Sequence, residues 1–273
     1  MNIATLANKN ALDDLKVFFY SLQLWNKTLP TVYVYCDSFI ETYIQNEKPY
    51  KGEIYTKNAL EKYSNYNRKQ MENIPGNEFP SLFGDFVVEK THLMDWVFET
   101  KDSVLFCDAD ICFLGELPII PPNTVLGVSP HVIRLRDEEK FGIYNAGFLY
   151  AADKTIPNKW KTYSRESKFF EQIAIENLVE IFPHYIFPIQ NNYGWWRLLQ
   201  GRESMETLSK KWSIKRDIGC GIYVEGLPLL SIHTHWITND SATKYFNSFI
   251  LAYFGLLKSV KKTKELHTFL LKN

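Results

Sequence analysis

The chain has 273 residues, of which 45% are hydrophobic and 23% are charged. This composition is that of a globular protein, and the length suits one large α/β domain or two small ones. The 31 basic and 31 acidic residues cancel, so a nucleic-acid-binding surface is not indicated.

The N-terminal segment has the pattern of a β-α-β unit. Residues 3–7 are apolar and predict a strand, and residues 11–26 predict a helix because apolar side chains recur at steps of three and four. After Pro30, the apolar run 31–36 predicts a second strand. Such a unit belongs to a parallel sheet with a right-handed crossover, so both strands are expected to end at the same edge.

A long helix and a buried strand are expected next. Residues 54–55 suggest a short third strand, and the polar stretch 58–80 predicts a helix with a mobile loop. Apolar residues recur on one side of 83–100, which predicts a helix. It leads directly into the apolar run 104–107, which is typical of a strand buried on both faces of a parallel sheet.

Two carboxylates, Asp108 and Asp110, follow that run. In an extended chain, residues i and i+2 point to the same side, so both carboxylates are expected together at the end of the strand. Unpaired carboxylates are costly to bury, and a divalent cation at the carboxyl edge of the sheet would remove that cost. A D-x-D triplet by itself is more often an ordinary turn or a helix cap than a metal site, so its context has to decide.

The second half of the chain continues the alternation of strands and helices. We expect strands at 125–128, 144–150, 218–224 and 227–235, a strand that leads into a loop at 182–192, and helices at 159–164, 169–180 and 241–271. No internal repeat or low-complexity linker interrupts the chain, which favours a single domain. It would comprise a nucleotide-binding half (1–115), a donor-sugar and acceptor half (116–240) and C-terminal helices (241–273).

The cysteine pattern indicates a reducing compartment, and the lengths of the apolar runs indicate that none of them spans a membrane. No C-x-x-C pair occurs, and we interpret the cysteines as buried thiols: Cys36, Cys107, Cys112 and Cys220. Residues 1–8 lack the pattern of a signal peptide, and no apolar run approaches the roughly 20 residues that span a bilayer. We therefore expect a cytoplasmic protein. The C-terminal helix becomes basic near 258–264, which is typical of a solvated face; peripheral membrane contact is the minority alternative.

Five motifs occur in one order along the chain: residues 89–96, Asp108-Ala109-Asp110, Asn145-Ala146-Gly147, Glu171-Gln172 and His233-Thr234-His235. In this order they resemble the nucleotide-sugar glycosyltransferases of GT-A fold, especially the glycogenin-like and bacterial galactosyltransferase-like group. The resemblance runs from Ile3 to Trp236 and is most specific between Lys90 and Asp110. It implies an α/β GT-A fold with a mostly parallel central sheet flanked by helices. It also implies transfer of a hexosyl or pentosyl group from a UDP- or GDP-sugar to a hydroxyl of a glycan or glycoconjugate.

The resemblance implies a divalent metal site for Mn²⁺ or Mg²⁺. Asp110 would be a direct ligand, and Asp108 would be shared between the metal and the donor ribose. A histidine from a late strand would complete the site. His233 matches best because it follows an apolar run, and His235, two residues on, competes for the role. A mixed carboxylate and imidazole set suits Mn²⁺.

The resemblance also implies a donor pocket. The nucleotide would lie against the ends of the first two strands, and Lys90 would face the donor sugar or its phosphates. Gly147 would let the backbone approach the sugar closely. The donor-binding residues implied in this way are Thr5, Ala7, Asp37, Lys90, Asp108, Ala109, Asn145 and Gly147.

Glu171 and Gln172 match the Asp-Gln pair that touches the sugar in this family, although Glu171 replaces the shorter Asp. An inverting enzyme needs a carboxylate base for the acceptor hydroxyl, and the candidates are Glu171 and Asp217. A retaining enzyme does not require one, and the sequence leaves both outcomes open. The family's Gly and Lys after the late histidine have no match beside His235; Lys244 is the candidate substitute.

The acceptor and two rival functions complete the expectations. Asn191, Trp195 and Trp196 belong to an aromatic turn that would form an acceptor-sugar platform or else pack in the core. A phosphohydrolase of the haloacid-dehalogenase type also ends a strand in D-x-D, but its triplet is usually N-terminal and followed by Gly-Thr, whereas Ile111-Cys112 follows here. A non-catalytic sugar-binding module would not need the acids and a histidine to converge.

Overall fold

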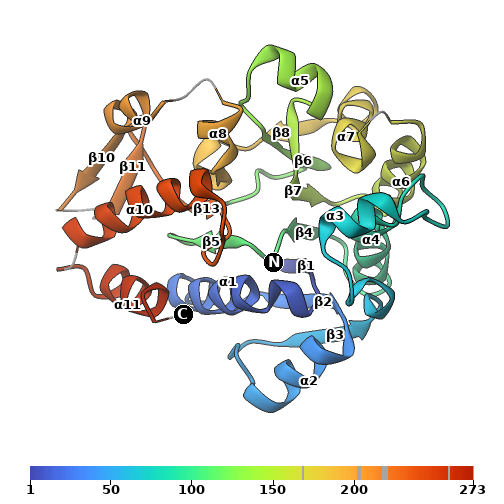
Figure 1. Cartoon of the computed structure of the whole chain (residues 1–273), viewed down its shortest axis with the longest axis horizontal. Helices are drawn as coiled ribbons and strands as arrows, with labels where there is room; N and C mark the ends of the chain where they lie inside the picture. Colours follow the sequence, from blue (N-terminus) through green and yellow to red (C-terminus); the bar gives the residue numbers. More distant parts are fainter. Residues whose placement is uncertain (168, 202–203, 217–220, 258, 273) are drawn as a thin grey trace.

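The computed structural model describes residues 1–273 except 168, 202–203, 217–220, 258 and 273, so Asp217 and Cys220 lie outside the described residues. Its central sheet has the strand order β3-β2-β1-β4-β7-β6-β8 (Figure 1). These strands are β3 (Ile54–Asn58), β2 (Thr31–Cys36), β1 (Asn2–Ala7), β4 (Val104–Cys107), β7 (Tyr144–Ala151), β6 (Leu126–Pro130) and β8 (His184–Ile186). β1 pairs in parallel with β2 and β4, whereas β7 runs antiparallel to β4 and β6. The expected α/β fold with a mostly parallel sheet is confirmed.

Helices cover both faces of this sheet. Along β1, Ala4 and Leu6 pack in one core with α4 (Leu82–Phe98), α6 (Ile156–Glu166) and α7 (Phe170–Ile181). Ile3 and Ala7 point the other way and pack in a second core with α1 (Leu12–Trp25) and α2 (Ser38–Glu47). Because both faces are buried, the central strand β4 is apolar at every position instead of alternating.

A small second sheet brings the C-terminal half against the D-x-D triplet. It contains β5 (Ile111–Phe113), β13 (Ser231–His233) and β9 (Tyr193–Gly194), with β13 in the middle. In the antiparallel register of β13 and β5, His233 lies opposite Ile111, one residue after Asp110. The buried hydroxyl of Ser21 on α1 accepts the backbone N–H of Phe113 at 3.0 Å, which joins β5 to the helix layer.

The remaining elements lie around this framework. A three-stranded hairpin sheet contains β10 (Trp212–Lys215), β11 (Gly221–Val224) and β12 (Leu227–Pro228), and it packs with α10 (Ser241–Leu256) and α11 (Lys261–Leu270) in a third core. The shorter helices are α3 (Arg68–Asn73), α5 (Leu135–Phe141), α8 (Trp196–Leu199), α9 (Met205–Lys211), and the 3-10 turns η1 (Lys9–Ala11), η2 (Glu61–Tyr63) and η3 (Ile189–Asn191). Figure 1 shows α11 beside α1 and α10 next to α11, at the side of the molecule remote from β3.

Several sequence expectations were wrong in detail. The helix α2 was not expected; Asp37 starts it by accepting the backbone N–H of Ile40 at 2.9 Å. The strand expected at 227–235 is interrupted between β12 and β13. The strand leading into a loop that was expected at 182–192 is confirmed as β8 and the segment after it. The loop after α3 is anchored, because Asp85 accepts the backbone N–H groups of residues 77–79 at 2.6, 3.1 and 2.9 Å.

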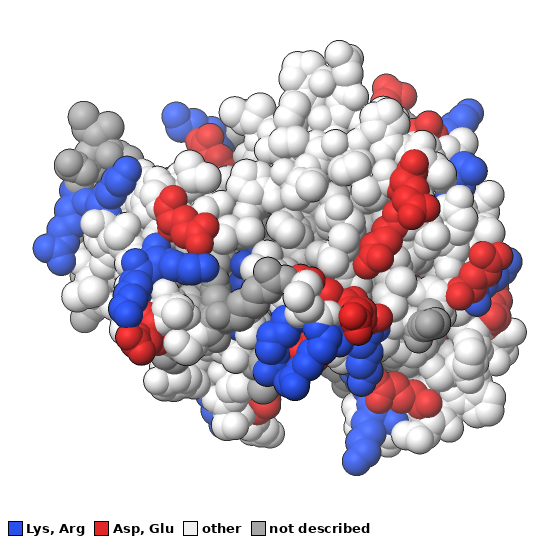
Figure 2. All heavy atoms as spheres, turned by 90° about the horizontal axis from the view of Figure 1, so that it is seen from above, with Lys and Arg blue, Asp and Glu red and all other residues white. Residues whose placement is uncertain are grey.

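The surface carries both signs of charge. Figure 2 shows acidic and basic side chains interspersed on the face seen from above. The balanced composition therefore extends to the distribution of charge on that face. Within the described parts of the chain, each helix is too short or too polar to cross a lipid bilayer.

Candidate functional site

Asp108 and Asp110 lie in a tight turn that joins β4 to β5. The backbone N–H of Ile111 donates to the carbonyl of Asp108 at 3.2 Å and closes the turn. The expectation that strand alternation aligns the two carboxylates is therefore wrong, because the chain leaves the extended conformation at Asp108. The turn is held from both sides: Asp108 N donates to Gly147 O at 2.8 Å, and Thr234 N donates to Asp110 O at 3.0 Å.

His233 converges on this turn. One ligand atom from each of Asp108, Asp110 and His233 lies within 4.8 Å of the others. Nε2 of His233 is 3.0 Å from Oδ1 of Asp110 and 3.8 Å from Oδ2 of Asp108. Two carboxylates and one imidazole are hard and borderline donors of the kind that hold Mn²⁺ or Mg²⁺. The residues present therefore fit the divalent cation that the sequence predicts.

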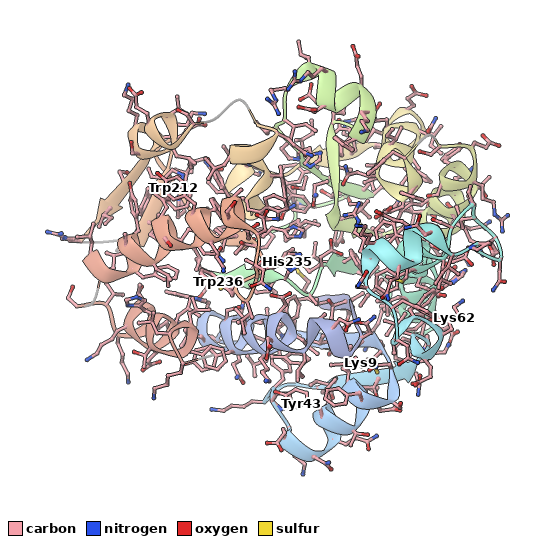
Figure 3. All side chains as sticks on the ribbon, in the orientation of Figure 1. Lys9, Tyr43, Lys62, Trp212, His235 and Trp236 are labelled. Carbon is pink, nitrogen blue, oxygen red and sulfur yellow. The ribbon has the colours of Figure 1, made fainter. Side chains whose placement is uncertain are left out.

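His235 lies on the far side of Asp110. It follows β13 in the segment that leads to α10, where Figure 3 labels it beside Trp236. Its Nε2 is 3.5 Å from Oδ2 of Asp110, and its Nδ1 is 2.8 Å from Oδ2 of Asp14 on α1. The charge of Asp110 and the hydrogen bond to Asp14 raise the pKa of His235 to about 9. The pair of carboxylates thus favours a positive charge on His235 beside Asp110.

Lys90 joins the D-x-D turn to Glu171. Its ammonium is 3.3 Å from Oδ1 of Asp108 and 3.0 Å from Oε1 of Glu171, and it lies over the ring of Phe106. Burial works against a charged lysine, but the two carboxylates outweigh it and raise the pKa of Lys90. Lys90 is thus a fixed positive charge between the first aspartate and the start of α7.

The side chains of the site form a row in which carboxylates alternate with basic groups, which are histidine or lysine side chains. Burial opposes ionisation of Asp110, yet the neighbouring charges of His233 and His235 outweigh it and lower the pKa of this carboxyl. Each carboxylate in the row has a cationic or ionisable partner on at least one side, so the acids tolerate burial. In spatial order the row is Asp14, His235, Asp110, His233, Asp108, Lys90 and Glu171.

The strand β7 passes directly behind this row at Gly147. A Cβ on Gly147 would contact Oδ2 of Asp108 and lie 2.5 Å from Cε1 of His233 and 3.0 Å from Oδ1 of Asn145. Only a hydrogen atom fits at this position without moving the turn or the imidazole. Gly147 is therefore part of the site through its lack of a side chain.

His131 and Trp196 form the wall next to His233. The rings of Trp196 and His233 meet edge to face with centroids 4.8 Å apart, and Trp196 donates from Nε1 to the carbonyl of His131 at 2.9 Å. Nδ1 of His131 is 3.4 Å from Nε2 of Gln172, whose amide also donates to Phe141 O. Burial lowers the pKa of His131 to about 4, so this imidazole is neutral over the physiological range.

The other predicted residues occupy the rim or the core. Asp37 is 1% exposed and accepts from Ile40 N, Lys9 N and the hydroxyl of Ser64, so its carboxylate is a helix cap. Thr5 is fully buried and its hydroxyl has no hydrogen-bond partner among the described residues. Four further predicted residues are at least partly buried: Ala7, Ala109, Asn191 and Trp195. Asp217 is outside the described residues.

Sequence reasoning missed three residues that contact the site. Asp14 looks like an ordinary acid in the first turn of a helix. Asn192 is fully buried and reaches Nδ1 of His233 at 3.0 Å. His131 follows the strand β6, and its only sequence signal is a polar residue directly after an apolar run.

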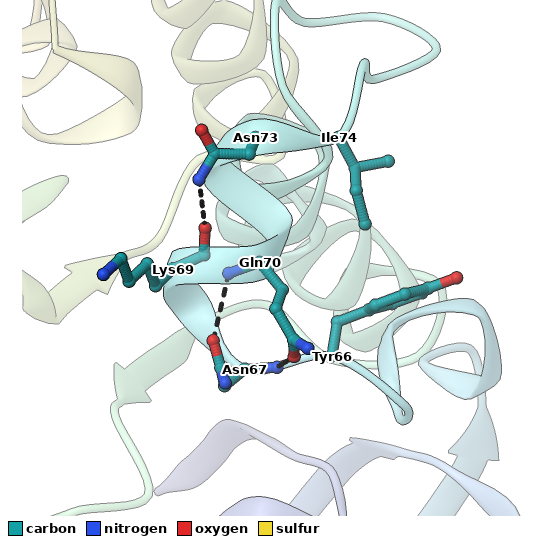
Figure 4. Close-up of a pocket in the computed structure, with 6 residues that line it drawn as sticks. All are labelled: Tyr66, Asn67, Lys69, Gln70, Asn73 and Ile74. Atoms are coloured by element: carbon teal, nitrogen blue, oxygen red, sulfur yellow. Dashed lines mark hydrogen bonds between the residues drawn. The ribbon is translucent and has the colours of Figure 1, made fainter.

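A shallow pocket lies on α3, near the end of β1. The segment before α3 reaches η1, because Asn10 Nδ2 donates to the carbonyl of Tyr66 at 3.1 Å and Lys9 Nζ lies 2.9 Å from Oδ1 of Asn65. Reciprocal bonds between Asn67 and Gln70 cap the helix (Figure 4). The pocket is lined by Tyr66, Asn67, Lys69, Gln70, Asn73 and Ile74.

Solved structures with the same fold are glycosyltransferases. The chain superposes on the apo form of the glycosyltransferase GlyE of Streptococcus pneumoniae with a TM-score of 0.56 and 15% identity, over 99% of this chain and 63% of that one. It superposes on the galactosyltransferase LgtC in complex with donor and acceptor sugar analogues with a TM-score of 0.56 and 14% identity, over 90% and 94%. The bifunctional glycosyltransferase WbbM gives a TM-score of 0.54 at 10% identity, over 98% of this chain and 51% of that one.

At these identities the likeness shows the fold, which is the GT-A fold expected from the motifs. The chain spans less than two thirds of GlyE and about half of WbbM, but almost all of LgtC. Neither a family model nor a curated protein sequence matches the chain.

The geometry around Gly147 predicts that Gly147→Ala weakens metal binding. The added methyl group would displace Asp108 or His233, and we expect the affinity for Mn²⁺ in a calorimetric titration to fall on the order of tenfold or more. Gly255→Ala is the matched control, because a Cβ at Gly255 meets no atom within 4 Å. Equal affinities for wild type and Gly147→Ala would show that Gly147 does not constrain the metal site.

The buried His131 predicts a loss of stability in mild acid. Its folded pKa of about 4 lies below the unfolded value of 6.5. Its contribution is therefore present above pH 6.5 and is lost as the pH falls toward 4, because only the unfolded chain takes up the proton. We expect this residue to remove about 2–3 kcal/mol from the free energy of unfolding between about pH 7 and about pH 4.5.

Urea titrations in EDTA at both pH values measure this effect. The variant His131→Gln, which cannot be protonated there, should lose less stability than wild type over the same interval. An identical loss in both proteins would contradict a buried neutral His131.

Proposed function

We propose that this chain, which has the fold of the GT-A glycosyltransferases, is a metal-dependent glycosyltransferase. It would move a hexosyl or pentosyl group from a UDP- or GDP-sugar to a hydroxyl of a glycan or glycoconjugate. One observation carries the proposal: two carboxylates of a D-x-D turn and an imidazole from a strand more than a hundred residues later meet at the edge of the sheet. Open α/β folds bind their ligands at such an edge.

The metal would be held by Asp108, Asp110 and His233. When bound, a divalent cation acts as a Lewis acid for the negative charge that a nucleoside diphosphate gains as it leaves the sugar. His233 is the better candidate ligand because it is 6% exposed beside both carboxylates, whereas His235 is 51% exposed and pairs with Asp14.

Lys90 and Glu171 would act on the donor sugar. Lys90 is a permanent cation beside Asp108 and attracts the donor phosphates to the same place. Glu171 lies 3.0 Å from this cation. If the reaction inverts the anomeric carbon, Glu171 would take the proton of the acceptor hydroxyl, with Asp217 as the alternative base. If it retains the configuration, Glu171 and Gln172 would orient the sugar.

The rest of the proposal concerns the rim of the site. The nucleotide would lie across the ends of β1 and β2, near Ala7 and the segment capped by Asp37, with Ala109 of the D-x-D turn beside it. The acceptor would approach along the turn 191–196, where Trp195 is partly exposed and Trp196 forms part of the wall next to His233.

The described thiols of Cys36, Cys107 and Cys112 are free and buried, which supports a reducing compartment such as the cytoplasm.

A thermal-unfolding experiment with added nucleotide separates this function from its rivals. We expect UDP or GDP together with Mn²⁺ to raise the Tm of wild type by several degrees, since ligand at about 100 times its Kd adds about 2.7 kcal/mol of stability. A haloacid-dehalogenase-type phosphohydrolase or a non-catalytic sugar-binding module would show no such joint protection.

The variant Asp110→Asn should lose both the protection and the hydrolysis of nucleotide sugars in a donor screen, because its amide replaces a ligand charge. Asp102→Asn, at an exposed position before β4, should behave as wild type. Full transfer by Asp110→Asn would rule out the metal role.

A further inference from the structure

His233 is held from behind by a chain of hydrogen bonds. Its Nδ1 lies 3.0 Å from Oδ1 of Asn192, and Nδ2 of Asn192 lies 2.9 Å from Oδ1 of Asn145. Oδ1 of Asn145 accepts the backbone N–H of Gly147 at 3.0 Å. His233 is 5% exposed, Asn192 is 0% exposed and Asn145 is 7% exposed. Water therefore does not compete for most of these groups.

The donor and the acceptor of each hydrogen bond in this series follow from the group at its end, the backbone N–H of Gly147. A backbone N–H can only donate, so Gly147 requires the carbonyl oxygen of Asn145 in front of it. That oxygen requires the amino group of Asn192 on its other side, and the same amino group also reaches Oγ of Ser129 at 3.1 Å. Asn192 is left with its carbonyl oxygen toward His233, which has to donate from Nδ1.

We propose that Gly147, Asn145 and Asn192 form a relay that fixes the metal-binding tautomer of His233, with the proton on Nδ1 and Nε2, 3.0 Å from Oδ1 of Asp110, left for the cation that would separate the two acceptors. The proposal rests on the metal-dependent function proposed above, since Nε2 is the atom that would bind the cation. Hydrogen bonds to the second nitrogen of a metal-binding histidine set the orientation and basicity of the ring. Asn145 and Asn192 are thus positioning residues, a role for Asn145 other than contact with the donor sugar.

The opposite tautomer does not fit this surrounding. With the proton on Nε2, the lone pair of Nδ1 would face the carbonyl oxygen of Asn192 at 3.0 Å, and two acceptors would repel each other. Rotating the amide of Asn192 by half a turn would not remove the repulsion, because the oxygen of Asn192 would then lie 2.9 Å from the oxygen of Asn145 and two acceptors would face each other again. In a buried network such an unpaired group is costly. The backbone of β7 therefore determines which nitrogen of His233 is free.

The first test is the affinity for Mn²⁺ alone, measured by calorimetry on the full chain. Asn192→Leu keeps the volume of the side chain but removes the acceptor for His233, and we expect the Kd to rise about 10–100-fold. Gln190→Leu is the matched control, because Gln190 is a buried amide two residues away that donates to Val224 O at 2.8 Å and does not contact His233. It should bind Mn²⁺ like wild type.

The second test observes the tautomer itself and needs no variant of the relay. In protein with ¹⁵N-labelled histidine, long-range ¹H–¹⁵N spectra report which ring nitrogen carries the proton, and His233→Gln assigns the signals among the six histidines. On addition of diamagnetic Mg²⁺ we expect Nδ1 to stay protonated and the Nε2 signal to shift. Loss of the proton from Nδ1 on metal binding would overturn the relay even if Asn192→Leu did not fold.

The outcomes separate the relay from the function on which it rests. If wild type binds Mn²⁺ and folded Asn192→Leu binds it within about twofold with the same tautomer, the relay is wrong and the metal site stands. If wild type binds no Mn²⁺, both are wrong.

Discussion

The concentration of carboxylates at one edge of the sheet is the constraint on which the site depends. Asp108 and Asp110 are brought together by a turn, and two distant segments of the fold then supply three positive or ionisable partners. Lys90 comes from α4, while His233 and His235 come from β13 and the residues after it. Because unpaired buried acids are costly, the packing of these distant segments and the ionisation of the acids stabilise each other.

The architecture explains why residues so far apart in the chain can meet. β4 delivers the turn at the carboxyl edge of the main sheet, and β5 leaves it to pair with β13. The small sheet thus begins directly after the turn. The pairing of β13 with β5 sets His233 opposite Ile111 and so determines its position beside the turn. On the other side, β7 lies against the same turn and provides the glycine that leaves room for the imidazole. The site lies where the two sheets meet.

Much of this could be predicted from the sequence where the signal is local or periodic. The apolar runs of β1, β2 and β4 and the helical periodicity of α1 and α4 predicted the parallel core, and motif order predicted the meeting of Asp108, Asp110 and His233. The turn conformation of the D-x-D triplet was not predicted, since the triplet continues an apolar strand in sequence and only the pairing of β5 with β13 shows where the chain bends. The helix α2 was missed because only Ile40 and Ile44 are buried on it, so its apolar periodicity is weak.

Contacts between residues that are far apart in the chain could not be predicted from the sequence. Asp14 contacts His235 across 221 positions of the chain, and Asn192 reaches His233 across 41. Neither residue has a spacing that would single it out, and each has an ordinary local explanation, in a helix turn for Asp14 and in an aromatic loop for Asn192. The sequence likewise left His233 and His235 as rivals, because only three-dimensional geometry shows that they lie on opposite sides of Asp110.

The central claim is that a dication shares Asp108, Asp110 and His233, and pulsed electron paramagnetic resonance on the Mn²⁺-loaded protein tests it most directly. Coupling of the metal to an imidazole nitrogen should appear in wild type, persist in His235→Gln and disappear in His233→Gln. Coupling that survives in His233→Gln but vanishes in His235→Gln, or no imidazole coupling in wild type, would contradict the account.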